Sequence, residues 1–207
     1  MRSLTTAIGF LLAVVGLAVD VQAQSTTPVE YEWTRRLTAN GFAGVASVPS
    51  DGARVTGGGA VGWGIARRWL IEGSAAWFDL PPGANAYGAN LTAVVSLSMQ
   101  RPALPFVRFG VGMYAASYDA TKTEPPDFYA RRMTNVGPTS ERKSFRDPSV
   151  ILGGGVHVLV ARNWALRPEV EVTVALDGGH AYTVVSGLLR VAYSFERRPI
   201  TPARTHR

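Results

Sequence analysis

The sequence has no cysteine, few charged residues and only one long apolar run. Without cysteine, the 207-residue chain has neither a disulfide framework nor thiolate metal ligands, and no N-terminal cysteine can carry a lipid. Charged residues make up only 17% of the chain, against about 25% in typical soluble domains. Hydrophobic residues reach 46%, yet the mean hydropathy is only +0.07. Apolar residues are therefore interspersed with polar ones over most of a chain whose length suits one domain.

The single apolar run lies at the N-terminus. The positive segment Met1 to Ser3 precedes the apolar stretch Leu4 to Val19, and small residues lead to Ala23. This pattern predicts a signal peptide, residues 1–23, that is cleaved to leave Gln24 first in the mature chain. The alternative is a membrane-anchor helix, but the run is shorter than the roughly 20 residues that such a helix needs. A mature chain that enters a membrane must therefore do so as strands.

Alternation of apolar and polar residues dominates the mature sequence. In the clearest segment, Trp164 to Leu176, the valines share one face while Arg167, Glu169 and Glu171 share the other. A helix would mix these two sets, so the pattern predicts a strand. The same reasoning predicts eight strands, near 39–48, 55–66, 69–79, 88–99, 105–117, 149–161, 164–176 and 182–195. Most match or exceed the roughly 9–11 residues with which a tilted strand crosses a bilayer, whereas soluble strands average about 5–6.

The connections between these strands alternate in length. Short links are expected at 67–68, 100–104 and 162–163, and longer ones at 49–54, 80–87, 118–148 and 177–181. Outer-membrane barrels have short periplasmic turns and longer outer loops. The fold predicted is therefore all-β, an eight-stranded antiparallel up-and-down transmembrane β-barrel with both termini on the periplasmic side.

The two faces of the strands differ in residue size. One face carries valine, leucine, isoleucine and tryptophan, while the other is rich in glycine, alanine and serine with a few long charged residues. A soluble ligand-binding barrel keeps its apolar face inside, whereas a membrane barrel turns it outward. We expect the second arrangement, because a ligand-binding barrel lined by glycines, arginines and glutamates would have no apolar pocket. Aromatic residues near strand ends are then expected at the membrane interface, where amphipathic rings are favoured, although they could be ordinary core residues. These are Trp63, Trp69, Trp77, Trp164 and Phe195.

The opposite face supplies the predicted lining of the barrel. The inward polar residues are Glu72, Arg108, His157, Arg167, Glu169, Glu171 and Arg190. Eight strands enclose a space that side chains just fill. Charges held away from water must pair, and three arginines can balance three glutamates. We therefore expect a lumenal ion-pair network that closes the barrel; a gated narrow pore is the alternative.

Two segments carry a family resemblance. The closing strand, Gly187 to Phe195, alternates and ends in an aromatic residue, and Gly58 to Glu72 has the glycine-rich strand, turn and strand of a barrel hairpin. The chain resembles the small outer-membrane β-barrels of the OmpA-type and opacity-type eight-stranded kind. The resemblance implies an outer-membrane location and a structural or surface-interaction role. Residues 196–207 follow the final aromatic, unlike the usual form, and are expected to be a basic periplasmic tail after a barrel domain at 24–195.

No pattern in the sequence indicates catalysis. Gly57, Gly59 and Gly62 have the spacing of a dinucleotide fingerprint but lie inside a predicted strand with no helix after it. The three histidines lack metal-ligand spacing, and His157 lacks the neighbouring hydroxyl residue that the family's lipid A deacylases carry on the same strand. We therefore expect no enzyme activity, no cofactor and no metal.

The expected partners follow from charge and exposure. The net charge of +6 is spread over short arginine pairs and the tail, without a recognition element, so nucleic acid is not expected. Membrane lipids and lipopolysaccharide are the expected surroundings of a monomeric barrel. The long 118–148 loop is expected to contact an external partner, unless it is simply solvated. Alternatives to this role are a narrow channel for small solutes and a secreted soluble barrel that binds an apolar ligand.

Overall fold

The computed structural model describes most of the chain after residue 31. The described residues are 32–48, 52–99, 103–119, 121–122, 124, 126–133, 142–177 and 179–195. The signal peptide expected at 1–23 and the tail expected at 196–207 lie outside these ranges. Within the described part, no helix is long and apolar enough to span a membrane, and no group of three or more metal-ligating side chains occurs.

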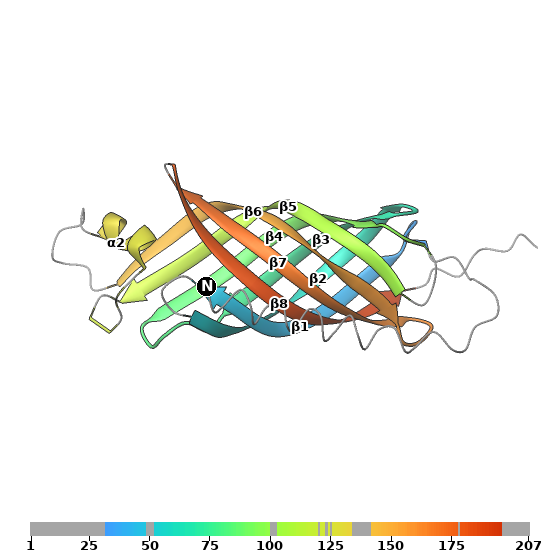
Figure 1. Cartoon of the computed structure of the whole chain (residues 1–207), viewed down its shortest axis with the longest axis horizontal. Helices are drawn as coiled ribbons and strands as arrows, with labels where there is room; N and C mark the ends of the chain where they lie inside the picture. The colour runs from blue at the N-terminus through green and yellow to red at the C-terminus, as the bar shows by residue number, and fades with distance from the viewer. Residues whose placement is uncertain are drawn as a thin grey trace, which may run out of the picture.

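Eight strands form one closed antiparallel barrel in which each strand pairs with its neighbours in the sequence (Figure 1). Strands β1 and β8 pair along their length and close the barrel, with Leu37 opposite Phe195. The all-β, eight-stranded, up-and-down fold expected from the sequence is therefore confirmed. The strands are β1 Leu37–Val48, β2 Gly52–Ala66, β3 Trp69–Phe78, β4 Ala84–Ser96, β5 Ala103–Asp119, β6 Arg142–Leu159, β7 Trp164–Asp177 and β8 His180–Phe195.

Alternation decides which side chains face the interior. Along β7, Arg167 and Glu169 are buried, while Leu166 and Leu176 on the other face are exposed. The contrast holds around the barrel: Leu152 is 65% exposed and Arg108 is fully buried. Bulky apolar side chains thus point outward and the ionic ones inward, as the sequence predicted.

The outer connections differ from the prediction. The segment 118–148 is not one loop, because β5 continues to Asp119, α2 occupies Asp127–Met133 and β6 begins at Arg142. The β7–β8 connection is as short as a periplasmic turn, since β8 begins at His180 and Gly179 adopts a φ of 91° that only glycine takes readily. The expected rule of longer outer loops therefore holds clearly only between β5 and β6.

One predicted strand end is also wrong. The fourth strand was predicted to reach residue 99, which would place Met99 on the outward face, but β4 ends at Ser96 and Met99 is buried at 7% exposure. The alternation does not extend past the end of the backbone ladder, so the period-two rule misplaces this side chain.

Strand β6 is paired on both sides only over part of its length. Its residues from Arg142 to Pro148 pair with β5, while the pairing with β7 begins at Ser149. Among the described residues, the outer end of β6 therefore has a backbone ladder on one side only.

Candidate functional site

Six buried charges in the middle of the barrel form a single cluster. They come from β3 (Glu72), β5 (Arg108), β8 (Arg190) and three successive inward positions of β7, namely Arg167, Glu169 and Glu171. Each of the six is at most 7% exposed. The three guanidinium groups and three carboxylates balance in formal charge.

Glu169 lies at the centre of this ion-pair network. Its carboxylate is 2.5 Å from Arg190 Nε, 2.8 Å from Arg108 Nη1 and 3.4 Å from Arg167 Nη2. All three arginines therefore contact the same carboxylate, and these contacts link β5, β7 and β8 across the interior.

The other two carboxylates extend the network. Glu72 lies 2.8 Å from Arg167, 3.4 Å from Arg108 and 3.7 Å from Arg190. Glu171 lies 3.1 Å from Arg108 and 3.7 Å from Arg190. Every arginine contacts at least two carboxylates, so the buried charges compensate one another, which a low-dielectric interior requires. A buried salt-bridge network inside the barrel was expected, and the structure contains one.

Neutral residues that the sequence reasoning missed complete the network. Asn40 donates from Nδ2 to Glu72 at 3.1 Å and accepts from Arg190 Nη1 at 3.2 Å. The Arg190 guanidinium also lies over the ring of Phe42, 4.0 Å from its centroid. Both residues are on β1. Their signal was present, since Thr38, Asn40 and Phe42 share one alternating face.

Glycine on β6 makes room for these long side chains. A Cβ at Gly153 would lie 3.1 Å from Arg108 Cγ and 2.6 Å from the Val170 carbonyl oxygen. A Cβ at Gly155 would lie 2.8 Å from Glu169 Cβ. The inward glycines thus leave the volume that the ion pairs occupy.

His157 lies at the end of the barrel where β1 begins and β8 ends. Its ring packs edge-on against Trp33, with centroids 5.0 Å apart. Trp33 is 2% exposed and donates from Nε1 to Ser96 Oγ at 2.7 Å. Backbone bonds between Trp33 and Arg67 and between Arg36 and Gly64 hold this segment against the β2–β3 turn. A tryptophan just before the first strand therefore packs into this mouth of the barrel, which the sequence reasoning did not predict.

An aromatic cluster fills the opposite end of the barrel. Tyr129 of α2 is fully buried, with its ring centroid 4.8 Å from Phe145, 5.2 Å from Tyr118 and 5.5 Å from Tyr182. The apolar cluster around it takes buried residues from seven of the eight strands. Burial raises the pKa of the Tyr129 hydroxyl, so this ring stays uncharged.

Arg132 fixes α2 to the barrel. Its Nη1 is 2.6 Å from Asp147 of β6, and its Nε is 3.3 Å from Asp177 at the end of β7. Its guanidinium also lies 4.7 Å from the centroid of the Phe145 ring. These contacts join α2 to β6 and β7 where those two strands are not paired with each other. The described interior is thus occupied at both ends and in the middle.

The outward aromatic residues lie where the sequence reasoning expected them along the strands. Trp69 and Trp164 begin β3 and β7, Phe195 ends β8, and Trp63 pairs with Leu37 at the start of β1. All four are between 40% and 47% exposed, and so is Trp77 near the opposite end of β3.

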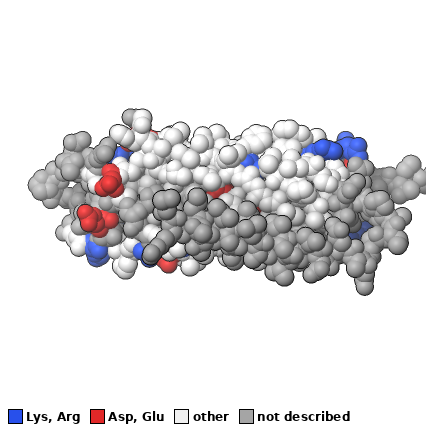
Figure 2. Space-filling model, viewed as in Figure 1, with Lys and Arg blue, Asp and Glu red and all other residues white. Residues whose placement is uncertain are grey.

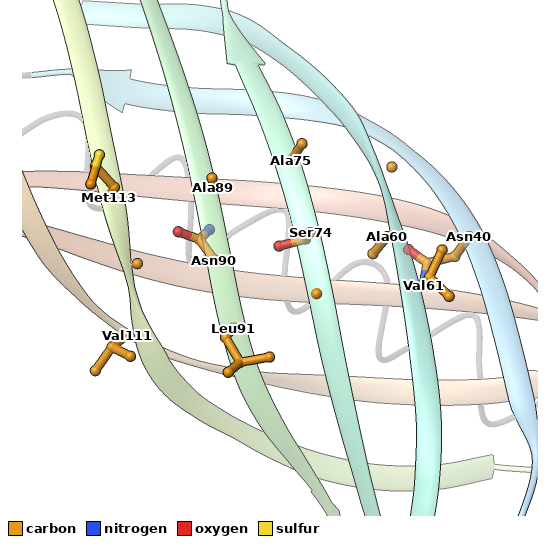
Figure 3. Close-up of a pocket in the computed structure, with 13 residues that line it drawn as sticks. Asn40, Ala60, Val61, Ser74, Ala75, Ala89, Asn90, Leu91, Val111 and Met113 are labelled. Carbon is orange, nitrogen blue, oxygen red and sulfur yellow. The ribbon is translucent and has the colours of Figure 1, made fainter. Parts of the chain in front are cut away.

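Two hollows lie outside the interior. One, of about 930 Å³, is a shallow depression in the outward apolar surface where small residues of β2 to β4 meet (Figure 3). Its rim includes Val61, Leu91 and Met113, all at least half exposed. The other, of about 550 Å³, lies at the outer end and is lined by both signs of charge, including Arg54 and Asp119.

Comparison with known proteins identifies the fold. No protein-family model matches the chain, and no curated protein sequence is significantly similar to it. Among solved structures, the N-terminal β-barrel domain of Pseudomonas aeruginosa OprF superposes with a TM-score of 0.56 at 12% identity, covering 78% of this chain and 98% of that one. Neisserial surface protein A (NspA) gives 0.57 at 14% identity, covering 77% and 96%.

A third similar structure contains a ligand. The attachment invasion locus protein Ail of Yersinia pestis, in complex with the heparin analogue sucrose octasulfate, gives a TM-score of 0.52 at 14% identity and covers 77% of this chain and 97% of that one. At these identities the likeness establishes architecture alone. The chain has the fold of the small eight-stranded outer-membrane β-barrels.

Proposed function

We propose that this chain is an outer-membrane protein with a closed lumen and a structural or surface-interaction role, without catalysis. The observation that carries this proposal is the charge-balanced network around Glu169, which occupies the middle of the barrel. Trp33 and the aromatic cluster around Tyr129 occupy the two ends. Ions would have to displace three layers of packed side chains to pass.

Conductance in planar bilayers tests the closed lumen. The purified barrel should give no current above background at either polarity, while a porin added to the same bilayer should. Tyr129→Ala removes part of the outer layer only, so it should also remain silent because the ion pairs persist. Steady unitary currents from the unaltered protein would establish the narrow channel instead.

We also propose a cellular location for the protein. Residues 1–23 would be cleaved on export, leaving a barrel domain at 24–195 and a basic periplasmic tail at 196–207. The apolar outward belt, with Val111 and Leu152 at least 60% exposed, suits a lipid environment and not water. Membrane fractionation should recover the protein with outer membranes, and the mass of the mature chain should begin at Gln24. Recovery in the soluble periplasmic fraction would favour a secreted barrel.

The outer end is the proposed contact surface. It carries α2, the mixed-charge hollow and the segment 120–141, and it would meet lipopolysaccharide or an external partner. Ail, a structure of similar fold, is known with a sulfated heparin analogue, so heparin is a reasonable first probe. We propose that a single barrel, not an oligomer, presents this surface.

Replacing residues 120–141 with a short glycine-serine linker tests this surface. The last ladder pair, Asp119 with Arg142, would be kept, so the barrel should still fold. Binding of heparin, or adherence of cells that display the protein, should fall. Replacing the 49–51 connection between β1 and β2 with glycine and serine, which leaves Arg54, Asp79 and Asp119 of the hollow unchanged, is the matched control. Equal binding by all three proteins would refute a role for the segment.

A further inference from the structure

Helix α2 is held in the outer mouth of the barrel by side chains and not by a backbone ladder. Tyr129 inserts into the aromatic cluster, and Phe128 packs against Tyr182 with ring centroids 5.6 Å apart. Arg132 contacts two strand carboxylates, and its carbonyl oxygen accepts a hydrogen bond from Lys143 Nζ. Among the described residues, no hydrogen bond joins the backbone of α2 to the backbone of a strand. The helix is therefore seated on the barrel as a bound peptide would be.

The barrel supplies a pocket for the arginine of this helix. Asp147 of β6 and Asp177 of β7 both contact the Arg132 guanidinium, at 2.6 and 3.3 Å. The guanidinium carbon lies 4.7 Å from the centroid of the Phe145 ring. Carboxylates and an aromatic face are the groups that bind a guanidinium best. The Asp147 side chain is only 2% exposed, so a cation beside it compensates a buried charge. The chemistry of this pocket therefore favours arginine.

A second pocket lies beside the first and takes an aromatic ring. The ring of Tyr129 packs among three rings that belong to strands, namely Tyr118, Phe145 and Tyr182. Phe145 thus contributes to both pockets. Tyr129 and Arg132 are three positions apart, so one face of a helix carries both side chains. The two pockets are therefore spaced for a helix in which an arginine follows an aromatic residue at the third position.

The arginine pocket is open to the medium. The side chains of Arg132 and Asp177 are 30% and 39% exposed, so solutes reach the carboxylate of Asp177 directly. Acidic side chains are exposed at this end of the barrel, with basic ones beside them, on the face drawn in Figure 2. Helix α2 has only seven residues, and a helix this short is not stable without packing. The occupant of the two pockets can therefore change without the opening of any strand ladder.

We propose that the two pockets form a receptor for a helix of an external protein partner, and that α2 is the built-in occupant that this helix replaces. The partner helix would present an aromatic residue and, three positions later, an arginine. Because α2 is tethered, its effective concentration is about millimolar. A partner must therefore add contacts along the outer end of the barrel to compete. This inference rests on the proposed outer-membrane location, which makes the outer end accessible to other molecules.

Emptying the receptor makes it accessible to a peptide. In the full chain, Tyr129→Ala combined with Arg132→Gln removes both anchors of α2. The probe is a fluorescein-labelled peptide with the sequence of residues 126–133, and its anisotropy is followed with the protein in detergent. The double variant should bind this peptide at least about tenfold more tightly than the parent protein, whose receptor is occupied by the tethered helix. A peptide of the same composition, in an order that destroys the spacing of aromatic residue and arginine, should not bind.

Charge variants test the arginine pocket. Adding Asp147→Asn to the double variant should lower the affinity for the peptide at least about tenfold, because a charge-assisted hydrogen bond is lost. Asp79→Asn removes the same charge from an exposed position at the outer end, so it is the matched control and should keep the affinity. Heat-dependent mobility on gels checks that each barrel is folded. A peptide with Arg132→Gln gives the same comparison on the double variant without a further change in the barrel.

The outcomes separate this receptor from the proposed function. A folded double variant that does not bind the peptide at millimolar concentration overturns the receptor. Equal binding of the reordered peptide overturns it as well, and so does binding that neither Asp147→Asn nor the Arg132→Gln peptide weakens. All three results leave the outer-membrane location and the closed lumen intact, because fractionation and conductance measure those separately. Recovery of the protein in the soluble periplasmic fraction would refute the proposed location, and the external partner with it.

Discussion

Replacing Glu72 with glutamine should strongly destabilise the barrel. The carboxylate is fully buried and lies within 3.7 Å of Arg108, Arg167 and Arg190. Glutamine keeps the size of the side chain but leaves three buried guanidinium groups facing two carboxylates. An uncompensated buried charge costs about 3–5 kcal/mol. The unfolding equilibrium constant should therefore rise by roughly two to four powers of ten.

Urea unfolding of the protein in phosphatidylcholine vesicles measures this cost, with tryptophan fluorescence and gel mobility as independent probes. Glu32→Gln is the matched control, because it removes the same charge from the exposed pair with Arg67 and should cost less than about 1 kcal/mol. A second comparison combines Glu72→Gln with Arg167→Met, which restores charge balance. The double variant should be more stable than the sum of the two single losses predicts.

The reasoning fails if Glu72→Gln costs no more than Glu32→Gln. It fails also if the double variant shows simple additivity, because the 2.8 Å pair between Glu72 and Arg167 must then contribute nothing to their coupling. Either result would mean that water or rearranged side chains compensate the charge.

Three further changes test other parts of the barrel. Gly64→Ala would place a Cβ 1.6 Å from the Trp33 carbonyl oxygen, so it should displace Trp33 and shift the Trp33 fluorescence to the red. Gly73→Ala is the control, because its Cβ would have no atom within 4 Å and should cause no shift. Tyr129→Ala should free α2 and make the outer segment sensitive to protease at concentrations that spare the parent. A cysteine in place of Leu152, in this cysteine-free chain, should react with a lipid-soluble maleimide, and failure to react would refute its lipid-facing position.

The faces of the strands could be predicted because alternation is a local property. Arg167, Glu169 and Glu171 stand two residues apart, and any strand places them on one side. Their individual partners could not be predicted. Glu72 and Arg167 are 95 positions apart in the sequence, and their contact depends on the registers of all the strands between them. The sequence therefore indicated the composition of the network but not its geometry.

The outer end was harder to predict for a different reason. The stretch from Arg142 to Asp147 is rich in charge and was interpreted as part of a long loop, yet Phe145 and Asp147 alternate as inward residues of β6. Trp33 was missed because one tryptophan outside a strand carries no periodic signal. In both cases, packing against distant segments decides the conformation.

Among the described residues, the outer end of β6 has backbone amide and carbonyl groups that no second strand of the barrel pairs with. Such an edge can pair with a strand of another molecule and seed aggregation. In this stretch Arg142, Lys143 and Arg146 would repel a second copy of the same edge, and Pro148 has no amide hydrogen to donate. The charge that makes the segment resemble a loop would thus keep two copies of the barrel from joining edge to edge.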